Sequence, residues 1–210
     1  MSAIVLRVDA RDPDPVAMSR AAAILRDGGL VAFPTDTVYG LAVDPRQDDA
    51  VERLYDAKGR ERGMAIPLIA GRIEQALEAA RLGARERRLA EAFWPGPLSI
   101  VLPALPTIAA AVRGPGETVA VRVPDHAVAR ALALAFGFPI TATSANLSGQ
   151  AAAASADAID PTLASRLDAV IDVGAAPGGP PSTIVELTPE GPRLVRAGAI
   201  AWDRVLTFLE

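Results

Sequence analysis

Residues 28–41, Gly-Gly-Leu-Val-Ala-Phe-Pro-Thr-Asp-Thr-Val-Tyr-Gly-Leu, place a short apolar run between a glycine pair and a polar turn. The apolar run at 30–33 predicts a buried strand. The glycines end a helix that Asp14 and Pro15 open and that runs to Arg26. Residues 34–40 then carry polar side chains away from the end of the strand. A helix followed directly by a buried strand indicates an α/β arrangement.

The rest of the chain repeats this alternation. Further strands are predicted from apolar and β-branched runs, at 4–8, 98–102, 118–123, 139–143 and 169–173, with a short apolar run at 66–70 and a hairpin of 182–187 with 193–196. Further helices are predicted from apolar periodicity, near 48–58, at 73–80, 86–93 and 125–136, in a segment ending at 167, and at the C-terminus. The sequence has no internal repeat and no long linker, which predicts one domain over residues 1–210.

Composition limits the chemistry that the chain can perform. Half of the 210 residues are apolar, enough for a sizeable core and a cavity. The chain has no cysteine and one histidine, which excludes disulfides, thiolate nucleophiles, cysteine-ligated zinc and histidine clusters. The net charge of −4 gives no overall attraction to nucleic acid.

Hydropathy indicates a protein of the cytoplasm. The sequence opens without a basic region followed by a long apolar run, and no segment approaches the roughly 18 apolar residues that span a bilayer. We therefore expect a cytoplasmic location and no membrane partner.

Lysine and asparagine occur once each, although the chain uses arginine at every other basic position outside histidine. They are Lys58 and Asn146, and both lie in polar motifs within otherwise apolar sequence. Lysine is a compact charge that fits between phosphate oxygens, and asparagine offers both a donor and an acceptor. Chance retention is the alternative interpretation, and the polar surroundings favour a specific role.

Polar side chains gather at the ends of the predicted elements. The groups are Thr35 to Tyr39, Lys58 with Arg60, Thr118 with Arg122, Ser144 with Asn146, and Ser182 with Arg196. Cations with small hydroxyl and amide donors suit a phosphate-bearing ligand. Neither a P-loop nor a Rossmann glycine motif is present, so a nucleotide would bind by another route.

Several of these positions, and also His126, have structural interpretations. Arg122 lies on a predicted central strand and requires an anionic partner, which is either a ligand or a structural carboxylate. His126 at a helix start is favoured as a capping or solvated residue. Thr35 and Asp36 fit a turn after Pro34 as well as they fit a binding site.

Seven motifs in order closely resemble the YrdC/TsaC family, essentially from end to end. The motifs are 33–41 (FPTDTVYGL), 58–60 (KGR), 93–98 (FWPGPL), 119–124 (VAVRVP), 143–149 (TSANLSG), 182–185 (STIV) and 196–198 (RAG). The resemblance implies an α/β fold with a twisted open mixed sheet and flanking helices around a large cavity, the YrdC-like (DHBP synthase-like) fold. It also places the chain with the short, single-domain form of the family.

The resemblance implies a nucleotidyltransferase that makes L-threonylcarbamoyladenylate and pyrophosphate from L-threonine, bicarbonate and ATP, for threonylcarbamoyladenosine at position 37 of tRNA. ATP would be a substrate, with Mg²⁺ carried by ATP and no metal bound by the protein itself. Expected partners are the threonylcarbamoyl-transfer proteins as a functional link, and tRNA or double-stranded RNA as a possible contact.

The family pattern assigns roles to ten residues. The catalytic set would be Lys58, Arg60, Ser144 and Asn146. The ATP-binding set would be these four with Thr118, Ala142 and Arg196, and the threonine-binding set would be Thr37, Arg122, Ser144 and Ser182.

Departures from the pattern leave two other functions open. Met64 and Ile69 stand where the family often has polar or cationic residues, and Ala197 replaces a proline; Arg62 could supply the missing cation. A paralogous carbamoyl-adenylating enzyme with another acceptor is one alternative. An RNA-binding or ribosome-associated accessory protein is the other, and the acidic net charge argues against it.

Overall fold

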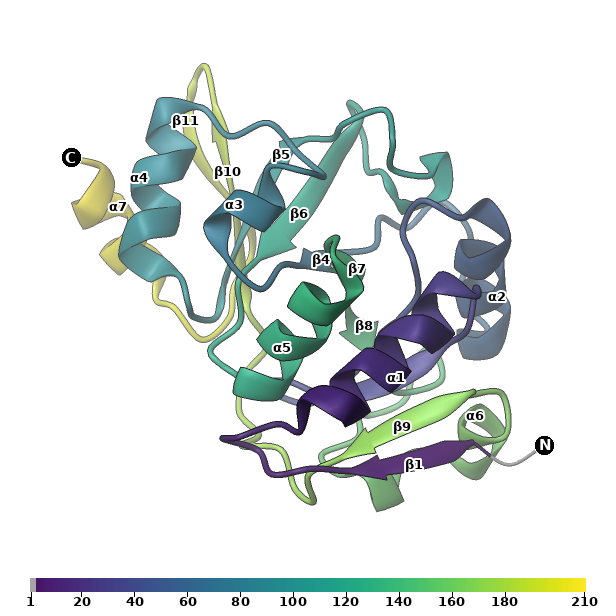
Figure 1. The fold of residues 1–210 in the computed structure, drawn as a ribbon. Coiled ribbons are helices and arrows are strands. Elements are labelled where there is room, and N and C mark those ends of the chain that lie inside the picture. The colour runs from purple at the N-terminus through teal and green to yellow at the C-terminus, as the bar shows by residue number, and fades with distance from the viewer. Residues whose placement is uncertain (1–2) are drawn as a thin grey trace.

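Two mixed sheets and their flanking helices form the fold (Figure 1). A computed structural model describes residues 3–210. The strands in that range are β1 (Ile4–Arg7), β2 (Val31–Pro34), β3 (Tyr39–Ala42), β4 (Leu68–Ile69), β5 (Leu98–Pro103), β6 (Thr118–Arg122), β7 (Ile140–Thr141), β8 (Thr143–Ser144), β9 (Ala169–Asp172), β10 (Thr183–Thr188) and β11 (Gly191–Arg196). The α-helices in that range are α1 (Pro15–Arg26), α2 (Asp48–Lys58), α3 (Ile73–Ala76), α4 (Ala84–Phe93), α5 (Ala127–Phe136), α6 (Pro161–Ala164) and α7 (Trp202–Leu209).

Each sheet combines parallel and antiparallel pairs. One sheet has the order β1-β9-β2-β3-β8 and the other has the order β11-β10-β5-β6-β4-β7. The pair β2–β9 is parallel, and the pair β2–β3 is antiparallel. The expected mixed α/β fold with flanking helices is confirmed, with its strands divided between two sheets.

The two sheets meet at Ala142. The apolar run at 139–143 predicts one strand, but the structure divides this segment. Thr141 pairs with Leu68 of β4, and Ser144 pairs with Gly40 of β3. Ala142 lies between the two halves and donates its N–H to the Pro67 carbonyl at 2.8 Å. The single-strand prediction is wrong here because the chain changes pairing partner within two residues.

Helices α1 and α5 pack side by side against the five-stranded sheet (Figure 1). Asp14 caps α1 by accepting the Val16 N–H at 3.0 Å, as the Asp-Pro start predicts. Ala21 and Leu25 point from α1 into the core and have no exposed surface. Burying a leucine side chain in this way stabilises the fold by about 1.5–3 kcal/mol.

The observed secondary structure differs from the sequence-based prediction in two other segments. Residues 39–42 belong to none of the strands predicted from the sequence, yet they form β3, where Gly40 lets the Phe33 ring approach: a Cβ there would lie 3.2 Å from that ring. The helix predicted to end at 167 is only a 3₁₀ turn and the one-turn helix α6, because Pro161 disfavours helical geometry at Asp160. The predicted hairpin is confirmed as β10 and β11.

None of the helices that the structure describes combines the length and the apolar character that a bilayer crossing requires.

Candidate active site

A cavity of about 590 Å³ lies where the two sheets meet. Its walls come from β3, β4, β5, β6, β8 and β10, and from the loops that leave these strands. The lining residues are Thr35, Thr37, Val38, Tyr39, Gly40, Arg60, Ala65, Pro67, Leu68, Ile69, Ser99, Arg122, Ala142, Thr143, Ser144, Ala152, Gly179, Pro181, Ser182, Ile184 and Arg196.

The structure brings seven of the ten assigned residues to this one cavity. The seven are Thr37, Arg60, Arg122, Ala142, Ser144, Ser182 and Arg196. Lys58 and Asn146 lie directly behind the wall, in contact with Ser144 or with each other. Thr118, at the first position of β6, is outside the lining, and its hydroxyl donates to the Pro115 carbonyl at 2.9 Å.

Lys58 is a buried cation that holds the backbone of the 144–146 turn. Its Nζ donates to the Ser144 carbonyl at 2.5 Å and to the Asn146 carbonyl at 2.7 Å. Gly59 adopts the left-handed conformation that ends α2, with φ of 58°, and so turns the chain toward Arg60. Burial, followed by repulsion from Arg60, lowers the pKa of Lys58 to about 8.

Arg60 enters the cavity without a carboxylate partner among residues 3–210. Its Nη1 donates to the Thr143 hydroxyl at 3.1 Å and its Nη2 to the Ala65 carbonyl at 3.0 Å. Its Nε is buried and has no hydrogen-bond partner within the described chain. Burial lowers the pKa of the Arg60 guanidinium, which is consistent with a charge that lacks an anion.

Asn146 fixes the turn that presents Ser144. The Asn146 Nδ2 donates to the Leu147 and Gln150 carbonyls, each at 2.8 Å, and its Oδ1 lies 3.5 Å from the Lys58 Nζ. The Ser144 side chain lines the cavity. The geometry gives Asn146 both a donor and an acceptor function, which neither Asp nor Arg could supply.

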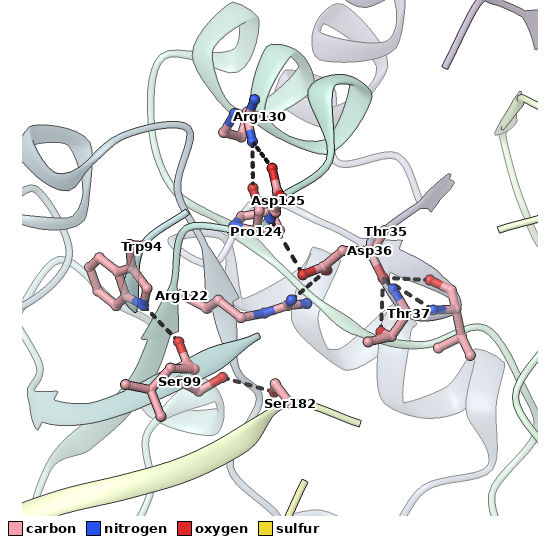
Figure 2. A network of polar contacts seen from close by, with 12 residues as sticks. Thr35, Asp36, Thr37, Trp94, Ser99, Arg122, Pro124, Asp125, Arg130 and Ser182 are labelled. Atoms are coloured by element: carbon pink, nitrogen blue, oxygen red, sulfur yellow. Dashed lines mark hydrogen bonds and ion pairs between the residues drawn. The ribbon is translucent and has the colours of Figure 1, made fainter. Parts of the chain in front are cut away.

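Arg122 and Asp36 form a buried ion pair at one end of the cavity (Figure 2). The Arg122 Nη1 donates to Asp36 Oδ1 at 2.5 Å, and the two side chains are 9% and 10% exposed. Beside them, the Thr35 hydroxyl donates to the Val38 carbonyl at 2.6 Å and lies 3.1 Å from the Thr37 hydroxyl. The turn interpretation of 35–38 is therefore confirmed, and Thr35 also lines the cavity, whereas Asp36 does not.

Two serines join Arg122's end of the cavity to the C-terminal hairpin. The Ser99 and Ser182 hydroxyls are 3.0 Å apart (Figure 2). The Arg196 Nη2 donates to the Ser182 carbonyl at 2.8 Å and to its hydroxyl at 3.0 Å. Arg196 lies at the exposed rim, and desolvation by the surrounding protein, followed by repulsion from Arg122, lowers its pKa.

Two positions that depart from the family pattern, Met64 and Ile69, and the neighbouring Arg62 lie in different settings. Met64 is 53% exposed and outside the cavity lining, whereas Ile69 is buried, lines the cavity and pairs with Arg122 across the β4–β6 ladder. Arg62 does not enter the cavity, because it binds the Glu52 and Asp56 carboxylates on the surface at 2.7 and 3.0 Å. Arg62 thus does not provide the substitute cation that sequence analysis considered.

His126 differs from the expected solvated or capping residue. It occupies the position before α5, but its side chain makes no cap hydrogen bond, and the residue is buried. Its Nδ1 has no hydrogen-bond partner within residues 3–210. Burial lowers the pKa of the His126 imidazole, so the ring is neutral at pH 7.

Two lining residues, Ser99 and Thr143, and Asp36, the partner of Arg122, are absent from the sequence-based assignment. Asp36 belongs to a polar cluster that sequence analysis describes, but nothing local distinguishes a turn aspartate from the partner of Arg122. Ser99 and Thr143 lie within apolar strands, and their roles depend on strand pairing across the sheets. Thr143 opens the motif 143–149, but the sequence assigns it no role, and Ser99 lies in no motif.

The cavity as a whole suits anionic ligands. Arg60 and Arg196 bring positive charge without carboxylate partners in the described chain, and Arg122 adds a cation that Asp36 compensates. Hydroxyl donors from Thr37, Thr143, Ser144 and Ser182 surround these cations. Such an arrangement can position phosphates and a carboxylate by charge-assisted hydrogen bonds.

Residues 3–210 contain no group of three or more His, Asp or Glu side chains that could hold a metal ion.

A family model and individual proteins match the chain over most of its length. The model described as "Telomere recombination", for Sua5, YciO and YrdC proteins, matches residues 23–198. The threonylcarbamoyl-AMP synthase of Bacillus subtilis is 38% identical over 90% of this chain and 55% of its own length. The putative threonylcarbamoyl-AMP synthase of Mycobacterium leprae is 39% identical over 96% of this chain and 92% of its own length.

The fold is shared with solved structures as well. Pyrococcus abyssi Sua5, crystallised with L-threonine, superimposes with a TM-score of 0.91 at 34% identity, covering 98% of this chain and 60% of that protein. The chain therefore spans little more than half the length of several relatives that it matches.

Proposed function

The chain belongs to the Sua5/YciO/YrdC family, and on that premise we propose that it is a threonylcarbamoyl-AMP synthase. The reaction would join L-threonine, bicarbonate and ATP to give L-threonylcarbamoyladenylate and pyrophosphate, the precursor of threonylcarbamoyladenosine in tRNA. One observation carries the proposal: a single cavity is lined by Arg60, Ala142 and Ser144 of the nucleotide set and by Thr37, Arg122 and Ser182 of the threonine set.

The proposed chemistry needs positioning more than proton transfer. Bicarbonate gives carbon dioxide by losing hydroxide, the threonine amine adds to the carbon dioxide to form a carbamate, and the proton that the amine loses combines with the hydroxide as water. A carbamate oxygen attacks the α-phosphorus of ATP, the new O–P bond forms, and the bond to the β-phosphate oxygen breaks as pyrophosphate leaves. Fixed cations lower the barrier by stabilising the negative charge that develops on the phosphate oxygens.

The residues divide this work by location. We assign the phosphates of ATP to Arg60 and Arg196, whose charges have no carboxylate partner among residues 3–210. Lys58 supports this end by holding the Ser144 and Asn146 carbonyls, and the Ser144 hydroxyl orients the adenylate. Thr118 is retained in the ATP set as a proposal, although its hydroxyl faces Pro115.

The threonine would bind next to the phosphates, on the side where Arg196 contacts Ser182. Arg122 would hold the carboxylate, with the Thr37 and Ser182 hydroxyls beside it. Mg²⁺ would enter on the phosphates of ATP, and none of the steps above depends on a protein-bound metal. We also propose that residues 1–210 act as one domain in the cytoplasm, in functional succession with threonylcarbamoyl-transfer proteins.

Pyrophosphate release tests this function. The purified protein is given ATP with L-threonine and bicarbonate, and each co-substrate is omitted in turn. We expect release to require both co-substrates and to be lost in Lys58→Ala, with threonylcarbamoyladenylate identified by mass. ATP binding without co-substrate-dependent release would overturn the proposal.

Amino acids other than threonine should be tested as acceptors in the same assay, because of the position of Ile69. This side chain is 1% exposed, lines the cavity and lies beside Arg122 in the β4–β6 pair, so it makes the wall near the proposed carboxylate site apolar. A panel of amino acids therefore accompanies threonine. Faster release with an apolar amino acid such as valine would favour the paralogous carbamoyl-adenylating enzyme.

A further inference from the structure

The pair of Arg122 and Asp36 is unusual among the ion pairs of the described chain. Of the salt bridges within residues 3–210, it alone has both side chains 10% exposed or less. Desolvating two charges is costly, and a buried pair often adds nothing to stability beyond what apolar residues would give. A buried pair in the wall of a ligand cavity therefore calls for an explanation other than folding.

The geometry leaves most of the Arg122 guanidinium unused. Asp36 Oδ1 accepts from Nη1 at 2.5 Å, which is the only hydrogen bond of this side chain within residues 3–210. Asp36 is itself held in the 35–38 turn, and its Oδ2 lies 3.4 Å from the Asp125 N–H (Figure 2). Asp36 thus fixes one edge of a planar group whose other N–H donors remain free for a ligand.

Charge compensation separates Arg122 from the other cavity cations. Arg60 and Arg196 line the same cavity and have no carboxylate partner in the described chain, so each attracts anions through its full charge. Arg122 with Asp36 is nearly neutral as a unit. A polyphosphate, whose affinity depends on net charge, will favour the first two, whereas a single carboxylate can still use the oriented N–H donors of Arg122.

We propose that Asp36 is a positioning residue that reserves Arg122 for a monocarboxylate and keeps the polyphosphate at Arg60 and Arg196. The inference deepens the proposed function and rests on it for the identity of the carboxylate as that of an amino acid. The preference of polyphosphate for Arg60 and Arg196 over Arg122 is independent of the proposed function, because it can be measured with inorganic tripolyphosphate alone.

Two substitutions separate orientation from charge. Asp36→Asn keeps an oxygen that can accept from Arg122 but removes the negative charge, and Asp36→Ala removes both. The matched control is Asp125→Asn, because the Asp125 carboxylate is 74% exposed and binds Arg130 at 3.3 Å. Circular dichroism and thermal unfolding establish that each variant is folded.

Binding is measured by calorimetry with L-threonine and, separately, with tripolyphosphate. Losing a charge-assisted hydrogen bond costs about tenfold or more in affinity, so we expect threonine to bind at least that much more weakly to Asp36→Ala. Tripolyphosphate should bind several-fold more tightly to Asp36→Asn, and should there compete with threonine. The gain in tripolyphosphate affinity should vanish in the double variant that combines Asp36→Asn with Arg122→Gln. The control variant Asp125→Asn should bind both ligands as the parent protein does.

Steady-state kinetics distinguish a positioning role of Asp36 from a purely structural role, which would not change KM for threonine selectively. We expect Asp36→Ala to raise KM for threonine and leave KM for ATP unchanged. Folded Asp36 variants that bind both ligands as the parent does would overturn the proposal, as would a tripolyphosphate gain that persists without Arg122. If the parent protein binds no threonine at all, the proposed function fails, while the tripolyphosphate titrations still decide the role of Asp36.

Discussion

At the scale of single residues, Lys58 shows what sequence reasoning can and cannot supply. Its rarity identifies it, because arginine fills the other basic positions outside histidine. Lys58 does not line the cavity. It is buried and donates to two backbone carbonyls of the turn that carries Ser144. Lys58 is separated from Ser144 by 86 positions in the sequence and from Asn146 by 88 positions. No local sequence pattern encodes contacts over such separations.

The lowered pKa of Lys58 predicts a pH dependence of nucleotide binding. With a pKa of about 8, Lys58 loses its charge as the pH rises through that value. If the charged form binds ATP, affinity for a non-hydrolysable ATP analogue should fall about tenfold between pH 7 and pH 9. Calorimetry across this range measures it, and Lys58→Met should bind weakly with no such dependence; a parent profile that is flat to pH 9 would contradict the idea.

The same shift has a defined effect on stability. The ordinary lysine pKa is about 10.4, so between pH 8 and that value the unfolded chain holds the proton that folded Lys58 has released. The unfolding free energy of the parent, relative to Lys58→Met, should therefore rise with pH in this window. Urea unfolding of both proteins at pH 7.5 and pH 10 tests the sign, and a falling difference would be incompatible with a lowered pKa.

At the scale of elements, the threonine end of the cavity depends on a close backbone approach. A Cβ on Gly198, just after β11, would lie 2.3 Å from the Pro181 carbonyl oxygen and 2.5 Å from Ser182. The Ala199 N–H also donates to that Pro181 carbonyl at 2.9 Å. The glycine thus holds the 174–181 loop against the hairpin and sets the position of Ser182, to which Arg196 binds.

We expect Gly198→Ala to lower the unfolding free energy by about 1–3 kcal/mol, as overpacking does, and to raise KM for threonine more than KM for ATP. Asp14→Ala is a suitable control, because it removes the α1 cap, costs about 1 kcal/mol, and lies far from the hairpin in the sequence. Unfolding curves and steady-state kinetics give both quantities. Equal effects of the two substitutions on KM would mean that only global stability is involved.

Elements with strong local signals were predictable from the sequence, and those defined by distant pairing were not. Helix α1 has a proline start, a capping aspartate and a glycine stop, and its bounds agree with the prediction. The segment 139–144 has only an apolar run, and its division into β7 and β8 depends on β4 and β3, which lie about 70 and 100 residues earlier. The cavity follows the same rule, since its cations were predicted and Asp36, Ser99 and Thr143 were not.

At the scale of the whole molecule, charge distribution separates the proposed enzyme from an RNA-binding protein. The net charge is −4, and several exposed arginines are already paired, as Arg193 is with Glu186 and Arg62 with Glu52. The densest basic stretch includes Arg87 on α4, which lies 4.0 Å from Glu91. Arg60 and Arg196, which have no carboxylate partner in the described chain, line the cavity between the sheets, where they serve a small anion better than a helical phosphate backbone.

We therefore expect affinity for double-stranded RNA to be weak, with a dissociation constant above roughly 10 µM at physiological salt, near the non-specific range. Fluorescence anisotropy at several salt concentrations measures the affinity and its salt slope, which counts the phosphates contacted. Reversing the α4 charges with Arg85→Glu and Arg88→Glu should leave pyrophosphate release unchanged. A tight complex with a steep slope that this reversal abolishes would favour the RNA-binding function, because only a surface patch, and not the cavity, can meet many phosphates at once.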